Sequence, residues 1–152
     1  MGGDRAKKLV LVVEDEPVLR ASMVRALTRL GVEVVDAATQ HDGLELLRAC
    51  SPDLVVTDLD LADGSAVPVI ARAQAPVIVI SAFLNEFHDE LRRFRTIRVH
   101  AKPLPIPSLV AEVTELLGVA RPRRTPFSAT DYIQLACMSQ HSVVIEMHAS
   151  WM

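Results

Sequence analysis

Three carboxylates follow an apolar run in the stretch VVTDLDLADG, residues 55–64, and they are Asp58, Asp60 and Asp63. Burying an unpaired charge is costly, so an acid directly after a buried strand must meet water, a cation or a reacting group. This marks Asp58 as a candidate for chemistry, whereas Asp60 and Asp63 fit solvated loop side chains. We also expect Asp63 and Gly64 to form a loop-and-cap pair that starts the next helix.

Polar residues end three other strand-like runs. Glu14 and Asp15 follow the first run, Ser81 ends the fourth, and Lys102 ends the fifth, just before Pro103. The carboxyl ends of parallel strands meet at one edge of a sheet, so these side chains should converge. Carboxylates at close range repel each other unless a cation lies among them. Oxygen ligands without nearby cysteine or histidine favour a hard ion, which in a cell is Mg²⁺.

Short β-branched runs alternate with helical spacing along the chain. The strand-like runs lie at residues 8–14, 32–37, 53–58, 75–81 and 97–102, and helical patterns lie at 17–31, 42–50, 87–94 and 108–118. Such alternation predicts a parallel sheet with helices on both faces. The second run alternates in polarity more than the others, so we expect it at an edge of the sheet.

The composition is that of a globular protein. The chain has 152 residues, half of them apolar, and a formal net charge of −3. This charge gives no indication of nucleic-acid binding, and no apolar run reaches the roughly 20 residues of a membrane helix. Cys50 and Cys137 lie far apart and fit reduced thiols. We therefore expect a cytoplasmic protein that does not contact a membrane.

The four strand ends together resemble the receiver domain of two-component response regulators. The shared pattern is an acidic pair, an aspartate, Ser-Ala and Lys-Pro after the first, third, fourth and fifth strands, over about residues 8–118. The resemblance implies an α/β, flavodoxin-like (βα)5 fold, a doubly wound parallel sheet with strand order 2-1-3-4-5. It also implies a bacterial phosphoprotein of a phosphorelay, which catalyses only its own phosphorylation and dephosphorylation and is not otherwise an enzyme.

By this resemblance Asp58 is the phosphoacceptor. It would take a phosphoryl group from a sensor histidine kinase, a phosphotransfer protein or a small acyl phosphate, giving an aspartyl phosphate. Asp15 and Asp58 would ligate Mg²⁺ directly, and the backbone carbonyl of Asp60 would be a third ligand. Glu14 would act through a bound water.

The resemblance also assigns roles around the phosphoryl group. Lys102 would pair with it, Ser81 would donate its hydroxyl to it, and the peptide bond between Lys102 and Pro103 would be cis. Receivers usually carry an aromatic residue three positions before this lysine, and here that position is Val99. The switch region of Ser81 and Val99 therefore has no aromatic rotamer switch, while His100 should point to the opposite face of its strand.

Two other interpretations remain open. The chain could be a constitutive interaction or dimerisation scaffold that keeps the receiver fold without signalling by phosphorylation, which Val99 favours. A phosphatase of the haloacid dehalogenase type also forms an aspartyl phosphate and has a second aspartate two residues later, as Asp58 and Asp60 do. The acidic pair at the first strand and the short chain argue against the phosphatase.

The composition changes after the proposed receiver domain at residues 1–118. Residues 119–127 are rich in proline and arginine and are predicted to be a linker. Residues 128–152 fit a helix followed by a strand, and weakly resemble the start of a PATAN-type module. This segment is either a truncated output segment or one that packs on the receiver or on a second copy. A homodimer through the strand edge at Val143 to Met147 is consistent with the last of these.

Overall fold

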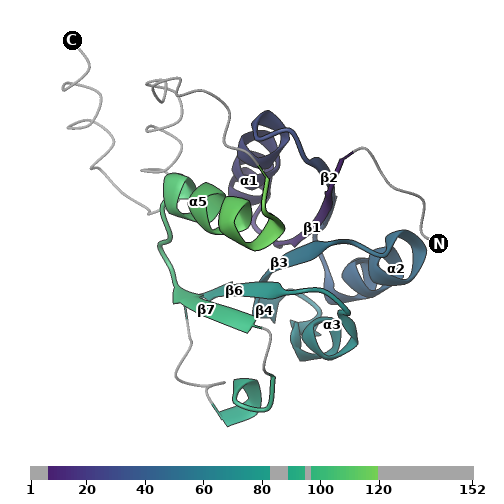
Figure 1. The fold of residues 1–152 in the computed structure, drawn as a ribbon. Helices are drawn as coiled ribbons and strands as arrows, with labels where there is room; N and C mark the ends of the chain where they lie inside the picture. Colours follow the sequence, from purple (N-terminus) through teal and green to yellow (C-terminus); the bar gives the residue numbers. More distant parts are fainter. Residues whose placement is uncertain (1–6, 83–88, 95–96, 120–152) are drawn as a thin grey trace.

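In the computed structural model, which describes residues 7–82, 89–94 and 97–119, a five-stranded parallel sheet lies between two layers of helices (Figure 1). The strands are β1 (Leu9–Val13), β2 (Glu33–Ala37), β3 (Leu54–Asp58), β6 (Val77–Ser81) and β7 (Ile97–Ala101). Their order is β2-β1-β3-β6-β7, and each neighbouring pair is parallel. This confirms the flavodoxin-like order predicted for the five parallel strands, with the second strand at an edge.

Helices cover both faces of the sheet (Figure 1). The helices α1 (Pro17–Arg29) and α5 (Ile106–Leu117) pack on one face, and α2 (Gln40–Cys50) and α3 (Val67–Arg72) pack on the other. Of the helix predicted at residues 87–94, residues 89–91 are helical, and residues 87–88 lie outside the described residues.

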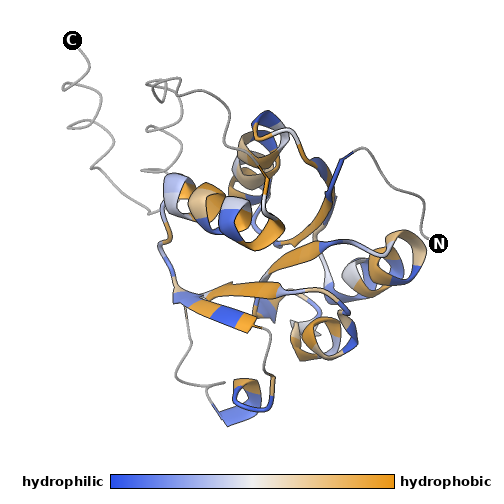
Figure 2. Ribbon diagram, viewed as in Figure 1, coloured by the Kyte–Doolittle hydropathy of each residue, from blue (hydrophilic) through white to orange (hydrophobic). Residues whose placement is uncertain are grey.

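The central strands divide their apolar side chains between two cores. One core contains side chains of α1 and α5 together with Val10, Val12, Leu54, Val56, Ile78 and Ile80. The other contains side chains of α2 and α3 together with Leu11, Val13, Val55, Val77 and Val79. Figure 2 shows the resulting apolar character of β1, β3 and β6, and a more hydrophilic β7. Each fully buried side chain of this kind stabilises the fold by about 1.5–3 kcal/mol.

The edge strand β7 is attached to α5 largely through charged side chains. Arg98 Nη2 lies 3.0 Å from Glu115 Oε1, and His100 Nε2 lies 2.7 Å from Glu112 Oε2. His100 thus contacts α5, while Val99 is 38% exposed. Solvent therefore reaches the Val99 side chain, at the position where the receiver domains that this sequence resembles usually carry an aromatic residue.

A short hairpin, not predicted from the sequence, follows β3. Its strands β4 (Asp60–Leu61) and β5 (Gly64–Ser65) are antiparallel, with Asp60 opposite Ser65 and Leu61 opposite Gly64. Leu61 is buried and Asp60 is exposed. The hairpin therefore has one face on the core and one in solvent.

The predicted linker at residues 119–127 and the tail at 128–152 lie outside the described residues, except for Val119. Its side chain packs against the core between the sheet and the α1–α5 layer. Within the described part of the chain, no helix has the length and apolar character needed to span a membrane.

Gly43 allows α2 to approach β1 closely. A Cβ atom at Gly43 would lie 3.1 Å from Cγ2 of Val13 and 3.5 Å from Cγ2 of Val69. Overpacking of such a site typically costs about 1–3 kcal/mol. We predict that Gly43→Leu lowers the free energy of unfolding by about 2 kcal/mol, measured by urea denaturation. The exposed Ala49 of the same helix is the control, and Ala49→Leu should change stability by less than about 0.5 kcal/mol. Equal losses in the two variants would contradict this role of Gly43.

Candidate functional site

Four charged side chains meet at the carboxyl ends of the strands, and we call them the acidic cluster: Glu14, Asp15, Asp58 and Lys102. One carboxylate oxygen from each of the three acids lies within 4.8 Å of the others. Lys102 Nζ lies 3.0 Å from Glu14 Oε1 and 3.0 Å from Asp58 Oδ2. Lys102 is 44 residues from Asp58 and 88 from Glu14 along the chain, and the parallel order of the strands brings them together.

Glu14 and Asp58 are largely withdrawn from solvent. Their side chains are 1% and 8% exposed, and that of Lys102 is 24% exposed. Each of the two carboxylates accepts a hydrogen bond from a backbone amide. The Glu16 N–H donates to Glu14 Oε2 (3.1 Å), and the Asp60 N–H donates to Asp58 Oδ1 (3.3 Å). These hydrogen bonds fix the direction in which each carboxylate faces.

Burial decides the titration of Glu14. The loss of hydration raises the pKa of Glu14 from 4.5 to about 7, against the attraction of Lys102 and with repulsion from Asp58. For Lys102, burial disfavours the ammonium, but the charges of Glu14 and Asp58 outweigh this and raise the pKa of Lys102 above its ordinary value. The lysine therefore remains a cation at neutral pH.

The raised pKa of Glu14 predicts a pH-dependent stability. The pKa of Glu14 is about 7 in the folded protein and 4.5 without these interactions. Between these two pH values Glu14 therefore keeps its proton in the folded protein and loses it in the unfolded chain. Stability is therefore highest below about pH 4.5 with respect to this group, and falls as the pH rises to about 7.

Glu14→Gln imitates the protonated acid and removes this dependence. Without divalent metal at pH 8, we expect the variant to be more stable by about 2 kcal/mol, and its stability to vary less between pH 5 and about pH 8. Urea denaturation in the presence of EDTA measures both effects. The exposed Glu33→Gln is the control, and equal pH dependence in Glu14→Gln and wild type would contradict the assignment.

Ser81 and Lys102 are joined through the backbone. Ser81 ends β6, its side chain is buried, and its carbonyl accepts a hydrogen bond from the Lys102 N–H (2.9 Å). The peptide bond between Lys102 and Pro103 is cis. The residues predicted at the ends of the fourth and fifth strands therefore lie side by side, next to the acids of β1 and β3.

The structure corrects the expectation for Asp63. Its carboxylate does not begin the next helix but accepts hydrogen bonds at the start of α2, from the Gln40 N–H (2.7 Å) and the His41 N–H (3.1 Å). These bonds lower the pKa of Asp63 below its usual value. Before α3, the Ser65 hydroxyl accepts a hydrogen bond from the Val67 N–H (3.1 Å), and the N-cap residue Ala66 provides no side-chain cap.

Arg20 and Gln40 also help to order this region, and neither was predicted from the sequence. Arg20 donates to the backbone carbonyl of Glu14 (2.8 Å) and pairs with Asp36 at 3.0 Å, so it fixes the chain at the end of β1. The side-chain amide of Gln40 donates to the carbonyl of Ser65. Neither residue had a sequence signal, although the spacing of Thr39 and Asp42 could have located the start of α2, where Thr39 Oγ1 accepts from the Asp42 N–H.

The acidic cluster fits a hard divalent cation. Its potential ligands are oxygen atoms of Glu14, Asp15 and Asp58, and the carbonyl of Asp60 follows two residues after Asp58. Mg²⁺ is bound by such oxygen ligands, one or two carboxylates being sufficient. Lys102 already contacts two of these acids, so the ammonium and a metal ion would share the same negative charge.

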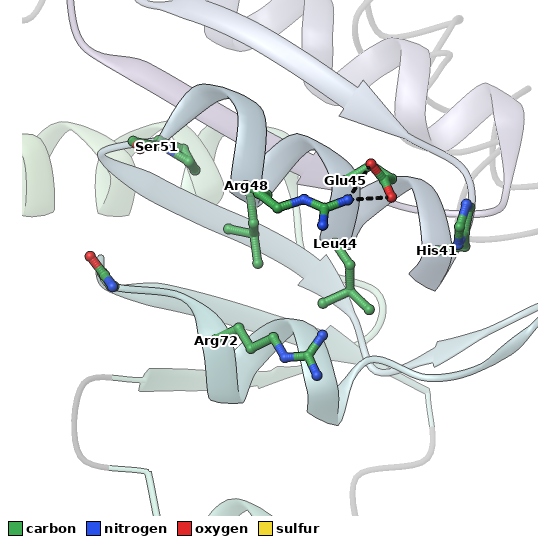
Figure 3. A pocket seen from close by; sticks show the side chains of 9 residues that line it. His41, Leu44, Glu45, Arg48, Ser51 and Arg72 are labelled. Carbon is green, nitrogen blue, oxygen red and sulfur yellow. Dashed lines mark hydrogen bonds and ion pairs between the residues drawn. The ribbon is translucent and has the colours of Figure 1, made fainter.

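A separate groove of about 850 Å³ lies between α2 and α3 (Figure 3). Leu44, Glu45, Arg48 and Arg72 are among its lining residues, and Arg48 Nη2 bonds to both carboxylate oxygens of Glu45 (2.7 and 2.8 Å). Among the described residues that line it, none belongs to the acidic cluster. The groove is therefore distinct from the site at the strand ends.

Comparison with known proteins shows the family to which the chain belongs. Residues 10–114 match the family described as the response regulator receiver domain. The chain belongs to this family. The receiver is thus shown by a match over most of the chain, in addition to its fold and to the grouping of its strand-end residues.

Individual relatives are of the same kind. The transcriptional regulatory protein AfsQ1 of Streptomyces coelicolor is 38% identical over 77 residues, which cover 48% of this chain and 34% of that protein. The transcriptional regulatory protein PdtaR of Mycobacterium tuberculosis is 31% identical over 120 residues, 74% of this chain and 57% of that protein. The receiver domain of PhyR from Erythrobacter litoralis superposes with a TM-score of 0.63 at 27% identity, covering 80% of this chain and 97% of that structure. The chain thus spans 34% of the length of AfsQ1 and 57% of the length of PdtaR.

Proposed function

We propose that this receiver takes a phosphoryl group on Asp58 in a Mg²⁺-dependent reaction and acts as a phosphorylation-controlled switch. The observation that carries the proposal is the environment of Asp58. Its carboxylate is 8% exposed, grouped with two other acids, and contacts the ammonium of Lys102 at 3.0 Å. Burying this much negative charge costs free energy that packing does not require, and such clusters are typical of functional sites, which supports the proposal.

In the proposed reaction a carboxylate oxygen of Asp58 attacks the phosphorus of a phosphohistidine. A phosphorus–oxygen bond forms, the phosphorus–nitrogen bond breaks, and the departing imidazole keeps the electron pair. Lys102 now pairs with the Asp58 carboxylate and would pair with the phosphoryl oxygens after the transfer. Ser81 is proposed as a second hydrogen-bond donor to these oxygens. The donor would be a sensor histidine kinase or a phosphotransfer protein.

The proposed metal ligands are Asp15, Asp58 and the carbonyl of Asp60, with Glu14 acting through water. Mg²⁺, when bound, neutralises charge on the phosphoryl group during its transfer. The chain's part is to keep these oxygens together before the metal arrives, through the strand ends and the hydrogen bonds to Glu14 and Asp58.

The signal would leave the receiver through protein contacts in the cytoplasm of a bacterial cell, including those of a second copy of the chain. We propose that the protein modifies only itself and is otherwise not an enzyme. One observation favours a constitutive scaffold instead, because the exposed Val99 offers no aromatic side chain that could swing inward. The two proposals differ in whether Asp58 accepts a phosphoryl group.

Intact mass spectrometry after incubation with acetyl phosphate and Mg²⁺ tests the switch. We expect wild type to gain one phosphoryl group, and Asp58→Ala or added EDTA to prevent the gain. Asp42→Asn is the matched control, because Asp42 is an exposed aspartate of α2 outside the acidic cluster, and this variant should still be phosphorylated.

Size-exclusion chromatography of the same samples shows how the signal leaves, as a phosphorylation-dependent change in elution would indicate a change in association. If neither acetyl phosphate nor a phosphohistidine donor modifies the wild-type protein, the switch is excluded and the scaffold is favoured.

A further inference from the structure

The hairpin β4–β5 follows the proposed phosphoacceptor and is too short to hold its own shape. Each strand has two residues, and an isolated two-stranded hairpin is at best marginally stable in water. Its position must therefore come from contacts with the rest of the fold. This matters because the hairpin contains Asp60, whose carbonyl is a proposed metal ligand.

One end of the hairpin is attached to the phosphoacceptor and to the core. The Asp60 N–H donates to Asp58 Oδ1 (3.3 Å), and the Ala66 N–H donates to the carbonyl of Leu59 (2.8 Å). Leu59 and Leu61 are buried at 0% and 4% exposure. These contacts fix the base of the hairpin but leave its turn to be held in another way.

The turn is held by α2. Asp63 accepts the Gln40 and His41 N–H groups at 2.7 and 3.1 Å, and the Gln40 side-chain amide donates to the carbonyl of Ser65. Ser65 is the residue directly opposite Asp60 in the hairpin. Gly64 has φ of +135°, and a Cβ there would lie 3.4 Å from Gln40 Nε2, so the amide passes close over the turn.

The helix that holds the turn is itself seated on the strand that leads to the other metal ligands. Gly43 of α2 packs against Val13, the last residue of β1, and Glu14 and Asp15 come next in the chain. The contacts thus run from Asp60 through Ser65 and Gln40 to α2, and from α2 to the end of β1. Through α2, these contacts fix the position of the β4–β5 hairpin relative to the end of β1, where Glu14 and Asp15 follow.

We propose that Asp63 and Gln40 are positioning residues, which hold the β4–β5 hairpin against α2 and so place the Asp60 carbonyl for metal binding. This inference rests on the proposed Mg²⁺-dependent function. Neither side chain belongs to the acidic cluster, and both act through backbone groups of the hairpin and of α2. Groups that orient metal ligands in this way typically change metal affinity by about 10- to 100-fold when they are removed.

The test compares Asp63→Ala with Asp42→Ala. Asp42 lies in the first turn of α2, close to the helix end that Asp63 contacts, and within the described residues its side chain has no hydrogen bond or ion pair. Asp42→Ala therefore removes one negative charge near this helix end, as Asp63→Ala does, without removing a bond to the hairpin. We expect Asp63→Ala to raise the dissociation constant for Mg²⁺ about tenfold by isothermal titration calorimetry, and Asp42→Ala to change it less than about twofold. Asp63→Asn, which keeps one acceptor, should fall between them.

A second pair of variants keeps the test decisive if Asp63→Ala does not fold. Gln40→Ala removes the bond to Ser65, whereas His41→Ala leaves the backbone N–H of His41 in place, so only the first should weaken Mg²⁺ binding. Phosphorylation by acetyl phosphate should need a higher Mg²⁺ concentration for half-maximal rate, with a similar rate at saturation. A purely structural role would lower the folded fraction and leave the half-maximal concentration unchanged.

The outcomes separate this inference from the proposed function. Equal Mg²⁺ affinity in Asp63→Ala and Asp42→Ala, with wild type phosphorylated, overturns the positioning role alone. Weaker Mg²⁺ binding in Asp63→Ala and Gln40→Ala supports the role even if wild type binds Mg²⁺ without being phosphorylated, in which case only the switch is lost. Failure of wild type to bind Mg²⁺ overturns both.

Discussion

The contacts of Lys102 with Glu14 and Asp58 join the ends of three strands that are far apart in the chain. Both acids are buried, so their charges are costly without a nearby cation. The parallel order of β1, β3, β6 and β7 is what makes the pairing possible, since it brings all of their carboxyl ends to one edge. The two apolar cores above and below the sheet offset the cost of this arrangement.

The same constraint explains why the surroundings of the site consist so largely of backbone hydrogen bonds. Carboxylates that must accept a metal or a phosphoryl group need free oxygen atoms, so the protein orients them with a few amides rather than with further cations. The backbone N–H groups of Glu16 and Asp60 have this role. The cluster is thereby ordered while its negative charge is only partly neutralised.

The sequence predicted the sheet and the strand-end residues because both depend on local patterns. Alternating apolar runs determine the strands, and the residue after each buried run is placed at the edge by the fold class. The bonds of Asp63 to α2 had no such signal, because they join residues 22 and 23 positions apart through an exposed turn. An aspartate followed by glycine looks the same in the sequence whether it caps its own helix or a neighbouring one. The raised pKa of Glu14 likewise depends on burial that no local pattern reveals.

The strand that ends next to Lys102 differs from those that carry the acids. All residues of β1 and β3 are buried, whereas every residue of β7 is at least partly exposed and its link to α5 is mostly ionic. Local opening of a protein begins where few apolar contacts must be broken. The ammonium of Lys102 thus follows a partly exposed edge strand, whereas Glu14 follows the buried strand β1 and Asp58 ends the buried strand β3. Local opening of this edge strand would therefore displace Lys102 more readily than Glu14 and Asp58.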